Sequence, residues 1–154
     1  MKALSEIPRP IRGAFFHILQ WTWCLPQNLL GALALLFFRG SRSRYHGAFV
    51  TVYRVRPGAR SLGGFSLGSF IFMPETWPAV DLERIVVHEY GHTVQSLFLG
   101  PFYLFVVGLP SVLWSRRFMR RRSVYRARGV EYTDRFPENS ASSLGERVTG
   151  EKSV

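Results

Sequence analysis

The chain has little cysteine, lysine and acidic side chain for its 154 residues. Its single cysteine, Cys24, can form no disulfide within the chain and cannot build a cysteine-rich zinc site. We interpret it as a buried, inert thiol, because it lies in an apolar run. Lysine occurs only at Lys2 and Lys152, so arginine supplies nearly all of the positive charge. With 20 Lys and Arg against 10 Asp and Glu, the formal net charge of +10 indicates an anionic partner, either nucleic acid or lipid.

The composition is that of a folded chain with room for one domain. Hydrophobic residues make up 47% and aromatic residues 15%, which argues against disorder. A chain of this length can build one modest core. We therefore expect a single domain over residues 1–145 and a flexible polar tail over residues 146–154.

Two apolar segments, residues 11–38 and 93–114, stand out along the chain. Each is close to the roughly 20 apolar residues that cross a bilayer, so we predict that both are embedded in a membrane. Pro26 interrupts the first segment and is followed by the polar pair Gln27-Asn28, which predicts a kink or a turn.

Between these segments the pattern changes to one typical of strands. Residues 48–55 and 63–73 are rich in β-branched and aromatic side chains, and together they predict a β-hairpin that follows a basic loop at residues 39–45. Within the second strand, residues 68–73 could offer an edge to an extended peptide. Asp81 is a plausible N-cap for a helix over residues 82–99.

The strongest motif of the chain is H-E-Y-G-H at residues 88–92, inside that predicted helix. Because residues four apart lie on one helical face, His88 and His92 can direct ring nitrogens at one zinc ion about 2.0–2.1 Å away. Glu89 flanks the metal without binding it, so we predict that it is the general base that takes a proton from zinc-activated water. A glycine costs about 1 kcal/mol in a helix interior, so Gly91 indicates close approach by another backbone or a substrate. The alternative is a plain pair of helical histidines, which the apolar surroundings disfavour.

A catalytic zinc needs one more protein ligand than two histidines provide. Carboxylates are few after the motif, and we favour Glu138 because it opens a short predicted helix after Pro137. Glu131 and Asp134 are the main alternatives. A solvated carboxylate at a helix start is the other interpretation of Glu138, since the helix dipole favours it there.

Three stretches of the chain resemble a group of small, uncharacterised bacterial membrane proteins that carry an HExGH zinc signature. They are HEYGHTVQSLFLGPFYLFVVGLPS (88–111), GFSLGSFIF (64–72) and LPQNLLG (25–31). The resemblance spans most of residues 20–145, and its specific part is the first of these stretches. It implies a zinc metallopeptidase in a membrane.

The stretch PENSASSLG (137–145) is similar to the ExxAD segment of gluzincins, which include membrane-bound prenyl-protein proteases. In that segment the glutamate is the third zinc ligand, which the resemblance places at Glu138. Its aspartate is replaced here by Ser142. HExGH followed by an apolar run also resembles site-2 intramembrane proteases, whose third ligand is an aspartate in a later membrane segment. Asp134 is the only downstream aspartate and lies in no apolar run, so we prefer the gluzincin-like interpretation.

The third ligand sets a condition on topology. If residues 93–114 crossed a bilayer as one straight helix, the two histidines and Glu138 would lie on opposite sides. We therefore predict that the chain turns back at Gly100-Pro101. Arginines flank both apolar segments, and the positive-inside tendency places them in the cytoplasm. Two helical hairpins, one turning near Pro26-Gln27-Asn28 and one at Gly100-Pro101, would keep the zinc site on the cytoplasmic side of a bacterial cytoplasmic membrane. Two ordinary membrane spans are the simpler alternative.

Residues 115–128 hold an arginine cluster, S-R-R-F-M-R-R-R-S-V-Y-R-A-R. Phe118 and Tyr125 are interleaved with the arginines, as stacking sites for nucleic acid would be. The cluster directly follows an apolar stretch, however, and this position is more typical of an anchor for anionic lipid headgroups. We favour the lipid anchor over the nucleic-acid site.

Together these patterns predict an α+β fold, namely a minimal zincin-like domain (a β-hairpin plus the HExxH helix) with membrane-embedded apolar helices. The predicted function is hydrolysis of a peptide bond in a peptide or membrane-protein substrate, with His88, His92 and Glu138 as zinc ligands and Glu89 as base. Tyr125 or Tyr132 would steady the oxyanion. The alternatives are a non-catalytic zinc-containing membrane scaffold or assembly factor, and a membrane-tethered nucleic-acid binder.

Overall fold

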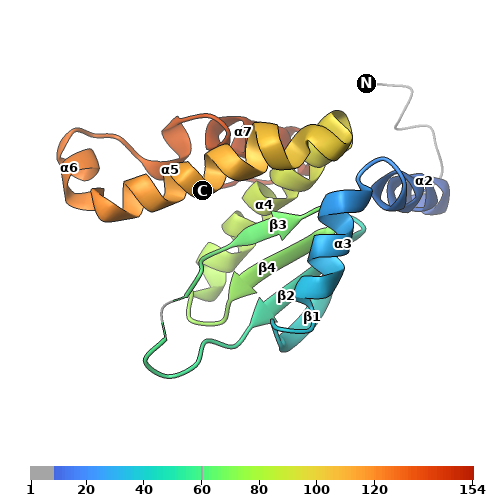
Figure 1. Cartoon of the computed structure of the whole chain (residues 1–154), viewed down its shortest axis with the longest axis horizontal. Helices are drawn as coiled ribbons and strands as arrows, with labels where there is room; N and C mark the ends of the chain where they lie inside the picture. Colours follow the sequence, from blue (N-terminus) through green and yellow to red (C-terminus); the bar gives the residue numbers. More distant parts are fainter. Residues whose placement is uncertain (1–8, 60) are drawn as a thin grey trace.

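A computed structural model describes residues 9–59 and 61–154, so Lys2 and the start of the predicted domain over residues 1–145 lie outside the described residues (Figure 1). The α+β prediction is confirmed, since the described residues form a four-stranded sheet and six α-helices. In chain order the elements are α2 (Arg9–Trp21), α3 (Leu25–Ala34), β1 (Gly40–Tyr45), β2 (Ala48–Tyr53), β3 (Phe65–Leu67), β4 (Phe70–Pro74), α4 (Ala79–Leu99), η1 (Gly100–Phe102), η2 (Leu104–Gly108), α5 (Leu109–Arg120), α6 (Arg122–Ala127), η3 (Tyr132–Asp134) and α7 (Glu138–Thr149).

The predicted hairpin between residues 48–55 and 63–73 is wrong. The strand order is β1-β2-β4-β3, and β2 pairs with β4 in parallel, with Val50 opposite Ile71. The second predicted strand is two strands, β3 and β4, because Gly68 adopts a positive φ that permits a tight turn between them. The predicted basic loop at residues 39–45 contains β1, an edge strand whose polar side chains face solvent while its backbone pairs with β2.

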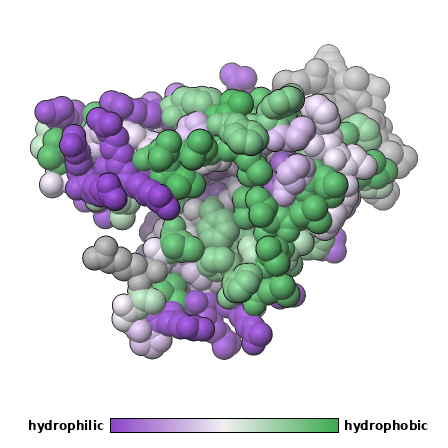
Figure 2. Space-filling view, in the orientation of Figure 1, coloured by the Kyte–Doolittle hydropathy of each residue, from purple (hydrophilic) through white to green (hydrophobic). Residues whose placement is uncertain are grey.

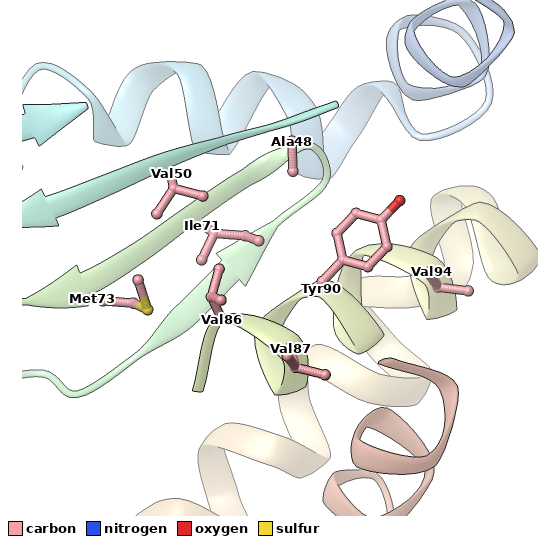
Figure 3. Packing of buried hydrophobic residues seen from close by; sticks show 8 residues of the cluster. All are labelled: Ala48, Val50, Ile71, Met73, Val86, Val87, Tyr90 and Val94. Atoms are coloured by element: carbon pink, nitrogen blue, oxygen red, sulfur yellow. The ribbon is translucent and has the colours of Figure 1, made fainter. Parts of the chain in front are cut away.

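The sheet is covered on both faces (Figures 1 and 3). On one face Val50 and Ile71 pack against Val87 and Tyr90 of α4. On the other face the aromatic side chains of β2, β3 and β4 pack against the C-terminal part of α3 and the residues after it. All five residues of β4 are buried, which explains why that strand is apolar throughout rather than alternating.

Two breaks divide the apolar segments. The break near Pro26 is present, but α2 ends earlier, at Trp21, and Pro26 lies in the first turn of α3. Gln27 and Asn28 are therefore helical and buried rather than part of a turn. The second break follows the end of α4 at Leu99, where Gly100 adopts a positive φ.

The chain turns back after α4, as predicted at Gly100-Pro101. The helical pieces Ala79–Phe102 and Leu104–Arg120 are bent by 120° relative to each other. In the described part of the chain no single helix has the length and apolar character to cross a membrane, whereas this bent pair meets that test by length and composition alone. The membrane-embedded part of the fold prediction thus stays a prediction.

The helix boundaries differ from the predictions at two places. α4 begins at Ala79 after Pro78, and Asp81 lies in its first turn instead of capping it, because proline already starts the helix with a fixed φ. α7 runs to Thr149, so the predicted tail from residue 146 begins inside a helix. α7 packs closely along α4, and tertiary packing of this kind stabilises a helix whose residues look polar in sequence.

Candidate metal centre

Two helices bring the predicted ligands together. His88 and His92 project from α4, and Glu138 is the first residue of α7. Glu138 Oε2 lies 3.0 Å from His88 Nε2 and 3.3 Å from His92 Nε2. The three side chains are buried, and their candidate ligand atoms all lie within 4.8 Å of one another. This His-His-Glu group could hold a metal ion.

The close crossing of α4 and α7 places Glu138 at this point. A Cβ at Gly91 would lie 2.6 Å from the carbonyl carbon of Ala141, and a Cβ at Gly145 would overlap the backbone carbonyl of Val87. One glycine from each helix therefore lets the two backbones touch. The close approach predicted from Gly91 is confirmed, and its partner is the backbone of α7.

A second layer of polar groups orients the histidines. His88 Nδ1 lies 2.9 Å from Ser142 Oγ, and His92 Nδ1 lies 2.7 Å from Gln95 Oε1. Gln95 Nε2 donates to the Pro137 carbonyl, which is a pure acceptor and so fixes the orientation of the amide. His92 Nδ1 must then carry the proton, which leaves a lone pair on Nε2 of the neutral ring.

Ser142, which stands where the resembling gluzincin segment has an aspartate, is the partner of His88 Nδ1. A serine hydroxyl can accept the Nδ1 proton of a ligand histidine as a carboxylate does, but without its charge. Gln95 has the corresponding role for His92 Nδ1. This role could be recognised only once α7 was known to lie beside Gln95, because α7 and the residue before it hold the Gln95 amide in place.

The residues fit a cation between them. If both neutral rings carry their proton on Nδ1, neither Nε2 has a hydrogen for Glu138, and a metal ion would satisfy all three facing atoms at once. Glu138 Oε1 and Glu89 Oε2 are also buried without a hydrogen-bond partner among the described residues. Buried polar atoms are rarely left unpaired, so these two point toward a ligand of the site.

The charges of the group are strongly coupled. Burial acts to raise the pKa of Glu138, but hydrogen bonds from His88 and His92, which form when their Nε2 atoms are protonated, outweigh it and hold that pKa well below its usual range. Burial acts to lower the pKa of His92, but contact with Glu138 and the nearby Glu89 raises it. The Glu138 carboxyl is therefore held in its anionic form, as a metal ligand must be.

Glu89 faces a cleft of about 560 Å³. One wall is β3 with the loop before it, the other is η2 with α5, and the floor includes Glu89, His92 and Glu138. A Cβ at Gly64 would come within 2.7 Å of Glu89 Oε1, so this glycine lets the loop backbone lie directly against the carboxylate. Burial raises the pKa of Glu89.

The fold places one of the two tyrosines predicted to stabilise the oxyanion in the cleft and the other outside it. Tyr132 lines the cleft, whereas Tyr125 stacks on Phe118 outside it, and its hydroxyl accepts a hydrogen bond from Arg117. Tyr103, which the sequence did not single out, is buried and lines the cleft too. Its position just after the break at Gly100-Pro101 was the available signal, because that turn directs the next residues back over α4.

The remaining carboxylate and strand alternatives lie elsewhere. Glu131 and Asp134 are exposed and form a capping box around η3, in which the Glu131 backbone nitrogen donates to Asp134. They are not part of the His-His-Glu group. The predicted substrate edge at residues 68–73 is wrong, because β4 lies between β2 and β3; the edge strand beside the cleft is β3.

No protein-family model, curated protein or solved structure matches this chain. Its class is therefore defined by the fold and the site alone. It is an α+β protein in which two closely crossing helices hold a buried His-His-Glu group that could bind a metal ion.

Proposed function

We propose that this protein is a zinc-dependent hydrolase that cleaves peptide bonds. The observation that carries the proposal is the convergence of His88, His92 and Glu138, with Glu89 between the histidines and open to the cleft. Two imidazoles and one carboxylate are a ligand set typical of catalytic zinc, which keeps a fourth position for water or substrate.

Each residue has a distinct role in this mechanism. The His-His-Glu group would hold zinc, which lowers the pKa of water and polarises a carbonyl oxygen. Glu89 accepts the proton that the attacking water loses and passes it to the leaving amine. Burial raises the pKa of Glu89 above its usual range, which makes its carboxylate a better proton acceptor.

The cleft walls would position an extended peptide. β3 is the terminal strand of the sheet, and its three residues line the cleft, so its outer backbone groups can pair with a substrate strand. Tyr103 and Tyr132 are the two tyrosines that line the cleft, and burial raises the pKa of both. Both therefore stay protonated and able to donate a hydrogen bond to a developing oxyanion.

The test is to measure zinc content and peptide hydrolysis in Glu89→Gln. We expect about one zinc per chain as in the unchanged protein, with hydrolysis of a fluorogenic peptide library lowered by about 10²–10⁴-fold through loss of the base. Glu83→Gln, an exposed glutamate on the same helix, is the matched control and should leave both measurements unchanged. Full hydrolysis in Glu89→Gln, or zinc content unaffected by His88→Ala, would refute the proposal.

A second candidate function is a zinc-stabilised scaffold or assembly factor without catalysis. It is favoured by the position of the group, which joins α4 to α7 and would clamp the two helices. This alternative predicts that a chelator lowers the melting temperature while Glu89→Gln is harmless in cells. The hydrolysis measurement separates the two candidates.

A further inference from the structure

Large apolar side chains are exposed along two stretches of the chain. On α3 and the residues after it, Leu33 is 53% exposed and Phe37 is 75% exposed. On the other stretch, from the end of α4 to α5, Phe98 and Phe105 are each 73% exposed. Further exposed residues of these stretches are Leu29, Leu30, Leu36, Phe102, Val106, Leu109, Val112 and Leu113. Contiguous apolar surface of this extent marks an interaction site rather than scatter.

The two stretches meet and form one surface, which we name the apolar face. Gln27 Nε2 of α3 donates a 2.9 Å hydrogen bond to the carbonyl of Gly100 in η1, and the Trp23 ring packs on the same glycine. Figure 2 shows hydrophobic residues gathered over α3 and over the η1–η2–α5 stretch, with hydrophilic residues at the α6 end and along the lower margin of the view.

Arginines follow the apolar residues on both stretches. Arg39 comes directly after the last apolar residues behind α3, and Arg116 and Arg117 come after those of α5; all three are exposed. More exposed arginines follow along the chain after each stretch, namely Arg42, Arg44, Arg120, Arg121 and Arg122. An apolar surface bordered by arginine matches the boundary between lipid tails and anionic headgroups.

The cleft over the metal group opens onto this face. Val112 is 48% exposed and belongs both to the face and to the cleft lining, while Leu62 on the opposite wall is 72% exposed. Arg116, one of the bordering arginines, also lines the cleft. A surface that covers the face therefore covers the mouth of the cleft.

We propose that the apolar face docks on a bilayer leaflet that contains anionic lipid, with the arginines on lipid phosphates and the cleft mouth against the membrane. The docking itself does not depend on catalysis. Its consequence for substrate choice rests on the proposed function: the substrate is a polypeptide segment that lies at the bilayer interface and enters the cleft from the lipid side.

Charge favours lipid over the other partners that an apolar face can have. A second copy of this chain would bring two molecules of net charge +10 together with their arginine margins adjacent, which is unfavourable. Nucleic acid would pair with the arginines but would leave the aliphatic side chains exposed to water. An anionic bilayer satisfies both features at once.

The experiment is flotation of the full chain, synthesised in a cell-free reaction with vesicles. One vesicle is phosphatidylcholine alone, and the other is equal parts phosphatidylcholine and phosphatidylglycerol. We expect preferential binding to the anionic vesicles, with or without a zinc chelator. The paired variant Leu33→Ser with Phe105→Ser should lose about tenfold or more in vesicle affinity, because both side chains bury in the leaflet.

The matched control is Val80→Ser with Val148→Ser, two residues of similar exposure on α4 and α7 away from the face. It should bind vesicles as the unchanged chain does. Equal loss in the control pair overturns the proposal, as does equal binding to both vesicles. The proposal is also overturned if the chain forms a dimer that the Leu33→Ser and Phe105→Ser pair dissociates. It is overturned too if the chain binds nucleic acid in preference to vesicles and only the arginines are needed for that binding.

The cleft orientation is tested by labels on single added cysteines, because Cys24 is buried. Labels at Leu62→Cys and Phe105→Cys should become shielded from an aqueous quencher when vesicles bind, whereas a label at Val148→Cys should not. A Leu62→Cys label that stays accessible overturns the lipid-side entry. Flotation and shielding are read without hydrolysis, so failure of the zinc-hydrolase proposal leaves these results interpretable.

Discussion

Gly91→Ala tests the link between helix packing and the metal group. A Cβ at this position would lie 2.6 Å from the Ala141 carbonyl carbon, whereas ordinary contact begins at 3.4 Å. The obstacle is backbone, which cannot rotate away, so α7 must retreat from α4 by about 1 Å. Glu138 is on α7 and must move with it, while the two histidines stay on α4.

Two opposing effects set the size of the change. Alanine gains about 1 kcal/mol over glycine in a helix interior, and overpacking costs about 1–3 kcal/mol. Gly13→Ala, in α2 with nothing within 4 Å of its Cβ, is the control that shows the gain alone. The free energy of unfolding should thus differ by about 1–3 kcal/mol between the variants, or about 2–12 °C in melting temperature at about 2–4 °C per kcal/mol.

Metal affinity is the sharper measurement. Ligand distances in metal sites are tolerated within about 0.2 Å, so a shift of Glu138 by about 1 Å should lower zinc affinity at least tenfold. Titration against a coloured chelator measures it, and Gly13→Ala should bind zinc as the unchanged protein does. If Gly91→Ala keeps both zinc affinity and melting temperature, the crossing of α4 and α7 does not position the ligand.

Three further predictions concern groups around the site. Ser142→Ala should weaken zinc binding by about 10–100-fold, because it removes the partner of His88 Nδ1, and Ser142→Asp should restore it; equal binding by both variants would contradict this role. Cys24 should resist iodoacetamide in the folded protein even at mildly alkaline pH, because burial raises its pKa, and should react once the chain is unfolded in urea. Asn28→Ala should cost about 1–3 kcal/mol in a urea melt, because its carbonyl oxygen accepts from both the backbone nitrogen and the hydroxyl of Ser69; an unchanged midpoint would show that these groups find water instead.

The features predicted well from the sequence are those set over a few residues. The spacing of His88 and His92 fixes a common face through the helical pitch, and Gly100-Pro101 ends a helix wherever it occurs. The sequence also indicated Glu138, because it opens a short predicted helix after Pro137, and a turn at that break was then needed for Glu138 to reach the histidines. The bend of 120° after α4 is the structural form of that turn.

The features predicted wrongly depend on which segments meet. The basic residues 39–45 have little strand preference, and their partner β2 makes them a strand by supplying backbone hydrogen bonds. Residues 63–73 look like one strand that could form a hairpin with β2, but they form β3 and β4, which a turn at Gly68 separates. β2 then pairs in parallel with β4. Tyr103 lines the cleft because the chain turns back after α4. Gln95 orients His92 because α7 and the residue before it lie beside Gln95.

The sequence by itself determined that two imidazoles would share one helical face, since this follows from residue type and helical pitch alone. Only the tertiary structure decided what completes that face. Glu138 and Ser142 arrive on α7, and they arrive because Gly91 and Gly145 lack the side chains that would hold the two helices apart. A contact between distant segments depends on the shapes of both helices. The local sequence of one helix does not reveal the shape of the other.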